Sequence, residues 1–195
     1  MYDIPCVIFA GGKSSRMGED KALLPFATFS TLTEYQYSRL KKIFTNVFIS
    51  TKSSDKFNFE ANFILDLQDS SNQYAPTSGF IAAFSQLNVD KFFVLSVDSP
   101  FIGKYEIQRL IDSDKDNYDA TIAKTDRGMQ PMCGIYHSSL SKSFTNMHKS
   151  QNHKLGFLLK NSLTNYLYFE DETPFLNLNH PYEYQEALNR VKSNS

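Results

Sequence analysis

The strongest constraint on the fold is an alternation between short β-rich runs and longer stretches in which apolar residues recur at helical intervals. The β-rich runs span residues 4–9, 46–50, 62–65, 91–97, 120–123 and 132–136. The helical stretches begin after Thr31, where Glu34 completes a Thr-x-x-Glu capping box, and recur over residues 78–87, 105–111 and 181–192. Parallel strands require connections of this length. The pattern therefore predicts one Rossmann-like α/β domain over residues 1–195, with a mainly parallel sheet and helices on both faces.

Composition and charge exclude several classes of protein. Hydrophobic residues make up 41% of the chain and charged residues 21%, which is typical of a globular protein rather than a disordered one. The formal net charge of −1 provides no overall attraction for nucleic acid or an anionic membrane, so neither is expected as a partner. The first apolar run is short and interrupted by Pro5, unlike a signal peptide. Cys6 and Cys133 are too few for a zinc motif, which favours buried thiols and a cytoplasmic protein.

Directly after the first β-rich run, residues 11–21 read GGKSSRMGEDK. This stretch lacks the leading glycine of a P-loop, and its glycines do not have the spacing of the dinucleotide fingerprint. Adjacent glycines let backbone N–H groups approach a ligand, and Lys13, Arg16 and Lys21 supply charge that suits a polyphosphate. The alternative is a glycine turn followed by a solvated basic loop. The three cations at the end of a strand favour a phosphate-binding loop.

Polar residues also end three further predicted strands. These residues are Ser50, Asp66 and Asp98. Open parallel sheets bind ligands at the carboxyl ends of their strands, so the three are expected close to the glycine loop. Asp98 follows a strongly apolar run, and its carboxylate is a candidate ligand for Mg²⁺, with a turn or a helix cap as the alternative. Asp69 has the same chemistry as Asp66, which leaves the choice between them open from the residues alone.

Three segments resemble motifs of one family. Residues 10–24 are similar to the signature loop of the molybdenum cofactor guanylyltransferases, residues 97–101 to their Cys-Asp-Thr/Met-Pro-Phe/Tyr segment, and residues 177–181 to their Asn-x-Asn-Thr-Pro segment. The resemblance implies catalytic roles for Arg16, Lys21 and Asp98, with Asp98 as the Mg²⁺ ligand. It implies contacts with the nucleotide or the second substrate for Phe9, Ala10, Gly11, Gly12, Lys13, Lys21, Ser50, Asp66, Gly79, Asp98, Asn177 and Asn179. From the residues alone, Asn177 and Asn179 could equally be polar residues leading into the last helix.

The resemblance also implies a reaction, in which GMP is transferred from GTP to the terminal phosphate of molybdopterin and pyrophosphate is released. Such a transfer needs positioned phosphates, a neutralised leaving group and magnesium. Transient contact with cofactor-insertion proteins or molybdoenzymes would follow. Gly11 stands where the related cytidylyltransferases have alanine, so GTP is expected to be preferred over CTP. The alternatives are a molybdopterin cytidylyltransferase, another sugar or alcohol phosphate nucleotidyltransferase, and a catalytically silent nucleotide-binding module.

Several features depart from the family pattern or have a simpler structural interpretation. The family segment Gly-Pro-Leu-x-Gly appears as Ala-Pro-Thr-Ser-Gly at residues 75–79, and His180 replaces a better helix cap. The four histidines have no metal-ligand spacing. Gln130-Pro131 is interpreted as the start of a strand, with a role on the substrate side as the alternative because the family segment often reads His-Pro there. The acidic run DSDKDN at residues 112–117 is interpreted as a solvated turn.

Overall fold

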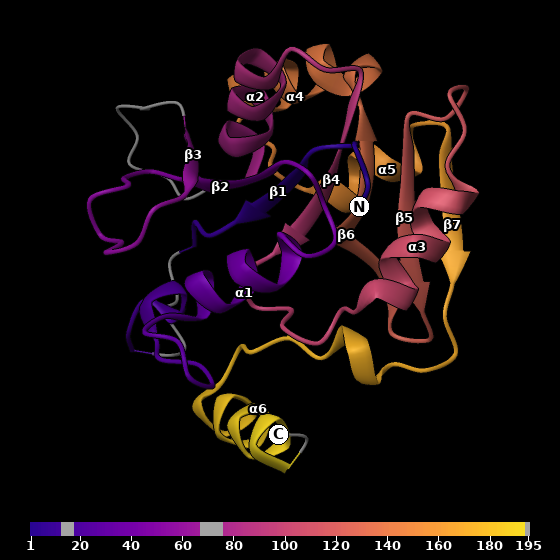
Figure 1. Ribbon diagram of the computed structural model, residues 1–195. Coiled ribbons are helices and arrows are strands. Elements are labelled where there is room, and N and C mark those ends of the chain that lie inside the picture. Colours follow the sequence, from indigo (N-terminus) through magenta and orange to yellow (C-terminus); the bar gives the residue numbers. More distant parts are fainter. Residues whose placement is uncertain (13–17, 67–75, 194–195) are drawn as a thin grey trace.

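The computed structural model describes residues 1–12, 18–66 and 76–193. Within these residues, seven strands form one sheet in the order β3-β2-β1-β4-β6-β5-β7 (Figure 1). The strands are β1 (Cys6–Phe9), β2 (Val47–Thr51), β3 (Asn62–Leu65), β4 (Lys91–Ser96), β5 (Ala120–Thr125), β6 (Gly128–His137) and β7 (Thr164–Tyr168). The predicted Rossmann-like sheet is confirmed, because the first four strands follow the order 3-2-1-4 of a doubly wound fold.

The sheet is mainly parallel, as predicted, and β6 is the strand that runs in the opposite direction. β1 is parallel to both of its neighbours, with Cys6 opposite Val47 on β2 and Phe93 on β4. β6 is antiparallel to β4 and to β5, whereas β5 and β7 are parallel. Because β6 is reversed, its first residues lie at the edge of the sheet where the other strands end. The turn between β5 and β6 is thereby placed at the edge that is expected to bind ligands.

Helices cover both faces of the sheet (Figure 1). One face carries α1 (Leu32–Leu40) and α3 (Lys104–Ser113), and the other carries α2 (Pro76–Leu87), α4 (Ser141–Lys149) and α5 (Leu155–Lys160). The last helix, α6 (Pro181–Ser193), lies beside the segment after the first short 3₁₀ helix, and its Tyr184 hydroxyl donates to the carbonyl of Pro25. The short 3₁₀ helices are η1 (Lys21–Leu23), η2 (Ser138–Leu140) and η3 (Thr173–Phe175). Among the described helices, none has both the length and the apolar character that a bilayer span requires.

The beginning of α1 is set by local sequence. Thr31 has extended backbone angles, and its Oγ1 accepts a hydrogen bond from the Glu34 N–H at 3.0 Å, as the predicted capping box requires. The carboxylate of Glu34 accepts from the N–H of Ser30 at 3.2 Å instead of from Thr31. The two bonds satisfy backbone donors that have no partner within the helix.

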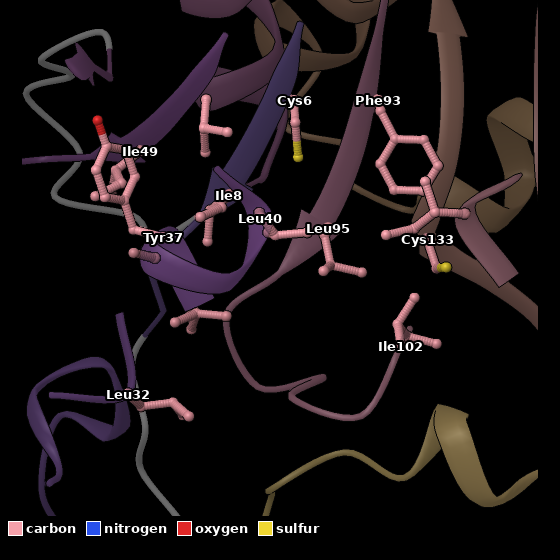
Figure 2. Close-up of a cluster of buried hydrophobic side chains, with 14 of the residues drawn as sticks. Cys6, Ile8, Leu32, Tyr37, Leu40, Ile49, Phe93, Leu95, Ile102 and Cys133 are labelled. Atoms are coloured by element: carbon pink, nitrogen blue, oxygen red, sulfur yellow. The ribbon is translucent and has the colours of Figure 1, made fainter. Parts of the chain in front are cut away.

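Two apolar clusters, one on each face of the sheet, form the core. Figure 2 shows the cluster beneath α1, where Leu40 of the helix packs among Ile8, Leu95 and Ile102, all of them 0% exposed. The other cluster includes the rings of Phe80 and Phe144, stacked with centroids 4.3 Å apart. Both cysteines are buried free thiols, as predicted. Burial raises the pKa of Cys133 to about 12 and raises that of Cys6 as well, so both thiols stay protonated.

Four elements and one acidic residue differ from the sequence-based expectation. Helices α4 and α5 and strand β7 were not predicted, and β6 begins at Gly128 rather than at residue 132. The prediction that residues 112–117 form a solvated turn is wrong for Asp114, whose side chain is 3% exposed. Asp114 accepts hydrogen bonds from Lys91, Thr121 and His137, because the end of α3 packs against the starts of β4 and β5 and the end of β6.

Candidate active site

A cavity of about 230 Å³ lies where the first parallel strands end. This strand-end cavity is lined by Phe9, Gly11, Gly12, Ser50, Lys52, Asp66, Pro76, Ser96, Met132 and Leu155. The list includes both glycines of the loop after β1 and the polar residues at the ends of β2 and β3, so these residues come together as predicted. Lys52, Met132 and Leu155 were not predicted as site residues. Met132 and Leu155 come from β6 and α5, which approach the cavity only in the folded chain.

Asp66 is held in this cavity by its neighbours. Its Oδ1 accepts a hydrogen bond from Ser50 Oγ at 2.7 Å. Burial raises the pKa of Asp66, although the Ser50 bond and the charges of Lys52 and Lys56 act in the opposite direction. The other oxygen, Oδ2, faces the glycine loop, because a Cβ built on Gly11 would lie 3.5 Å from it. The absence of a side chain at Gly11 therefore leaves space beside the Asp66 carboxylate.

Two of the predicted binding residues form the wall behind the cavity. Ala10 is 1% exposed, and its N–H donates to the Ser50 carbonyl at 3.0 Å, which ties the loop to β2. Gly79 lies on α2 with no room for a side chain, since a Cβ there would be 2.6 Å from Ser50 Oγ and 2.7 Å from Phe9 Cε1. Its role in this structure is to let α2 pack closely against the strand ends.

The C-terminal segment meets the glycine loop at Lys21 and Asp98. Lys21 Nζ lies 2.5 Å from Asp98 Oδ2, and it also donates to Asn179 Oδ1 and to the Leu178 carbonyl, each at 3.2 Å. The Leu178 N–H in turn donates to the Asp98 carbonyl at 2.9 Å. Three predicted site residues that are far apart in the sequence, Lys21, Asp98 and Asn179, are therefore in direct contact.

Asn177 contacts the turn that follows β4, next to Asp98. Its Oδ1 accepts a hydrogen bond from Ser99 Oγ at 2.6 Å. The turn into α6 is capped by Glu183, whose Oε2 accepts from the N–H groups of Asn179 and His180 at 2.6 and 2.8 Å. Glu183 thus satisfies the backbone donors of the two residues that precede α6.

A second cavity of about 180 Å³ lies on the far side of this segment. This C-terminal cavity is lined by Phe101, Arg127, Gln130, Phe175, Leu176, Asn177, Leu178, Asn179, Glu183, Glu186, Ala187 and Arg190. The interpretation of Gln130 as a simple strand start is incomplete, because β6 begins two residues earlier and Gln130 lines the cavity. Arg127 and Arg190 were missed because no local motif marks a cavity built from three separate segments.

The polar atoms at Lys21 suit a hard cation. Asp98 provides one carboxylate and Asn179 one amide oxygen, and the ammonium of Lys21 already lies among these oxygens. Within the described residues, no cluster of three or more His, Cys, Asp or Glu side chains could hold a metal by itself. Mg²⁺ commonly binds through one or two carboxylates together with waters and substrate phosphates, so the donors present fit an ion that arrives with a nucleotide. Lys13 and Arg16, predicted to bind phosphate, lie outside the described residues.

The strand order and the convergence of a glycine loop, Lys21 and Asp98 at the strand ends define an α/β protein of the nucleotidyltransferase type. Residues 6–165 match the MobA-like NTP transferase domain, and the chain belongs to this family. It is 39% identical over 192 residues to the molybdenum cofactor guanylyltransferase of Campylobacter jejuni subsp. doylei, covering 98% of this chain and 99% of the relative. The resemblance identified from the glycine loop is thereby confirmed.

Two further proteins agree with this assignment. The chain is 34% identical over 198 residues to the molybdenum cofactor guanylyltransferase of Helicobacter pylori strain G27, covering 99% of this chain and 96% of the relative. Among solved structures, the molybdopterin-guanine dinucleotide biosynthesis protein A of Archaeoglobus fulgidus superposes with a TM-score of 0.80 at 19% identity, over 97% of this chain and 100% of that one. At 19% identity, the similarity to the Archaeoglobus protein shows a shared fold only.

Proposed function

We propose that the chain transfers GMP from GTP to the terminal phosphate of molybdopterin, with release of pyrophosphate. The observation that carries the proposal is the Lys21–Asp98 contact, because residues next to it line two separate cavities. Ser96, two residues before Asp98, lines the strand-end cavity, and Asn179, which binds Lys21, lines the C-terminal cavity. A nucleotide in the first cavity and an acceptor phosphate in the second would meet at Lys21 and Asp98. The names of the Campylobacter and Helicobacter relatives support the same reaction.

The strand-end cavity offers a basis for recognising guanine. The Watson–Crick edge of guanine presents two neighbouring N–H donors, and one ionised carboxylate can accept from both. Asp66 supplies a carboxylate held in place by Ser50, and Gly11 leaves room beside it. Cytosine presents one donor beside an acceptor, so it cannot make the same pair of bonds. Asp66 would therefore favour GTP over CTP.

The transfer itself needs charge and position rather than a covalent intermediate. An oxygen of the acceptor phosphate attacks the α-phosphorus of GTP, a new P–O bond forms, and the bond to the β-phosphate breaks with release of pyrophosphate. Lys21 would bind the phosphates through its ammonium group. Asp98 and Asn179 would hold Mg²⁺, which when bound offsets the charge of the transferring phosphate.

The C-terminal cavity suits an acceptor that carries both a phosphate and a polar ring. Arg127, which pairs with Glu172, and Arg190 supply positive charge beside the carboxylates of Glu183 and Glu186. Gln130 and Asn177 supply amide groups. The guanidinium of Arg190 lies 4.9 Å from the centre of the Phe101 ring, which forms a flat wall. Molybdopterin, with a terminal phosphate and a pterin ring, has this combination of groups.

A pyrophosphate-release assay with GTP, CTP, ATP and UTP, each with and without molybdopterin, tests the proposal directly. We expect release that requires GTP, molybdopterin and Mg²⁺ together, and its loss in Asp98→Asn, where an amide keeps the shape but loses the charge. A preference for CTP would instead identify a cytidylyltransferase. Binding of nucleotide without release under any condition would identify a catalytically silent module.

We also infer where the protein acts and with what. The buried free thiols are consistent with a reducing compartment, which supports the cytoplasm as its location. The packing of α1 to α5 on one sheet, with Ala187 of α6 in one of the two core clusters, supports a single nucleotidyltransferase domain over residues 1–195. Transfer of the product to cofactor-insertion proteins or molybdoenzymes would require transient contact, detectable by crosslinking during turnover.

A further inference from the structure

Two polar side chains on α1 reach from beneath the sheet to the loop that carries Asp98. Gln36 Nε2 donates to the carbonyl of Val97 at 3.1 Å and to that of Ser96 at 3.3 Å. Arg39 Nη1 donates to the carbonyl of Ile102 at 2.5 Å, and its Nε donates to Gln36 Oε1 at the same distance. The two side chains therefore form one unit that binds the backbone on both sides of Asp98.

Polar side chains are unusual at these positions, because this side of α1 faces the apolar core. Gln36 is 0% exposed, and Leu32 and Leu40 on the same side of α1 belong to the apolar cluster. Burial lowers the pKa of Arg39 to about 10, so its guanidinium remains charged at neutral pH. Arg39 is absent from the ion pairs found within residues 1–12, 18–66 and 76–193, and its hydrogen bonds go to neutral groups. An apolar residue would fill such a position without the free-energy cost of desolvating a charge.

The carbonyls that Gln36 and Arg39 bind belong to Ser96, the last residue of β4, and to Val97 and Ile102 in the turn that follows, where the ladder of the sheet ends. Ile102, at the far end of this turn, places its side chain in the core near Leu95 and Cys133 (Figure 2). The same turn also receives the C-terminal segment, through the bonds to the Asp98 carbonyl and to Asn177. A shift of its backbone would therefore move Asp98 and the two asparagines together.

We propose that Gln36 and Arg39 are positioning residues that fix the backbone on both sides of Asp98 and so set the geometry of its carboxylate. The inference rests on the role given to Asp98 in the proposed function. Residues that orient a metal ligand through hydrogen bonds usually change metal affinity or activity by about 10-fold to 100-fold when they are replaced. Neither residue would contact the substrates.

Arg39→Lys and Gln36→Met test this role. Arg39→Lys keeps the charge but loses the planar fork that reaches Gln36 and Ile102 together, and Gln36→Met keeps the length but has no donors for Ser96 and Val97. The matched control is Thr31→Ala, which removes the cap of the same helix and leaves these contacts intact. Three quantities are measured: Mn²⁺ affinity of the chain–GTP complex by electron paramagnetic resonance, kcat against KM for GTP, and hydrogen exchange of the Leu178 amide.

We expect both variants to weaken Mn²⁺ binding and lower kcat about 10-fold or more, with KM for GTP nearly unchanged and faster exchange at Leu178. Thr31→Ala should lower thermal stability without these effects. Wild-type Mn²⁺ affinity and Leu178 exchange in either folded variant would overturn the inference, whatever happens to stability. Wild-type activity and Mn²⁺ affinity in Asp98→Asn would overturn the proposed function itself. That result is distinguishable because Leu178 exchange reports on the backbone of the turn, through the Asp98 carbonyl, and not on the Asp98 carboxylate.

Discussion

At the scale of single residues, Gly11 and Asp66 face each other across the strand-end cavity, and each has a role that can be separated from folding. Gly11 is not among the described glycines with positive φ, which are Gly18, Gly128 and Gly134. Alanine can therefore adopt its backbone conformation. The consequence of adding a methyl group at Gly11 is confined to the space beside Asp66 Oδ2.

Gly11→Ala should reduce kcat/KM for GTP by about 10-fold to 100-fold and change that for CTP much less, because the methyl group would occupy the side of Asp66 that guanine needs. The measurement is the ratio of specificity constants for GTP and CTP in both proteins. Gly12→Ala is the control for base discrimination: a Cβ there would contact nothing within 4 Å in the described structure, so any effect on nucleotide binding should be the same for GTP and CTP. An equal loss for both nucleotides would contradict the account of Gly11.

The ionisation of Asp66 should appear in the pH dependence of GTP use. Guanine needs the ionised carboxylate, and burial raises the pKa of Asp66 above its usual value. The preference for GTP over CTP should therefore fall, as the pH is lowered, at a higher pH than an ordinary aspartate would give. Asp66→Asn should abolish the preference and remove this pH dependence. A wild-type preference that stays constant down to pH 4 would contradict the assignment.

At the scale of elements, the approach of α2 to the strand ends determines the shape of the cavity. Gly79 allows this approach because it has no Cβ, and a Cβ at this position would collide with Ser50 and Phe9. Phe9 also packs against Phe80 of α2, with ring centroids 4.8 Å apart. The helix, the first strand and the Ser50–Asp66 pair proposed to bind the base are thus linked through a single small residue.

Gly79→Ala should destabilise the protein by about 1–3 kcal/mol and weaken GTP binding, because α2 must move away from Ser50 and Phe9. The higher helix propensity of alanine, about 1 kcal/mol, would offset part of the loss. Gly156→Ala in α5 is the matched control, since its Cβ would make an ordinary 3.5 Å contact with Met129 Sδ. Urea unfolding and GTP titration of both variants provide the comparison. Equal stability changes in the two would contradict the close-packing role of Gly79.

At the scale of the whole molecule, the candidate active site and a buried cluster of hydrogen-bonded charges lie at opposite edges of the sheet. The candidate active site occupies the edge where the parallel strands end. At the other edge, Asp114 joins α3 to Lys91 at the start of β4, to Thr121 near the start of β5 and to His137 at the end of β6. Burial alone would raise the pKa of Asp114, but hydrogen bonds from His137, Lys91 and Thr121 outweigh it, and the pKa lies below its usual value.

Asp114→Asn should lower the free energy of unfolding by about 2–3 kcal/mol at pH 7, because charge-assisted bonds to a buried carboxylate are lost. Since folding lowers the pKa of Asp114, its stabilising effect is present above about pH 4 and is lost as the pH falls through the lower folded-state value. The variant should therefore show a shallower loss of stability below pH 4. Urea unfolding at several pH values measures both effects.

Asp116→Asn is the control for this edge, because the Asp116 side chain is 96% exposed although it also pairs with Lys91. We expect it to change stability by less than about 1 kcal/mol. Transferase activity should be retained in both variants at temperatures where they are folded. A selective loss of activity in Asp114→Asn would show that the two edges are coupled.

The sequence by itself determined the strand ends and the chemistry placed at them. Alternating apolar runs and helical spacing follow from the backbone periods of 2 and 3.6 residues, so β1 to β4 and the helices between them could be read locally. The glycine loop, Ser50, Asp66 and Asp98 follow those strands directly, and parallel strands bring their ends to one edge. The beginning of α1 was equally local, because Thr31 caps a backbone N–H only three residues away.

Only the tertiary structure decided which of these residues touch and what else joins them. Lys21 meets Asp98 across 77 positions and Asn179 across 158, and contacts of that separation depend on how helices pack and which way β6 runs. The C-terminal cavity combines the β5–β6 turn with α6, which no local motif could reveal. Gln36 and Arg39 left only a weak signal, as polar residues on the apolar side of α1. Their partners are backbone carbonyls, and every residue has one, so the sequence carries no record of which carbonyls are bound.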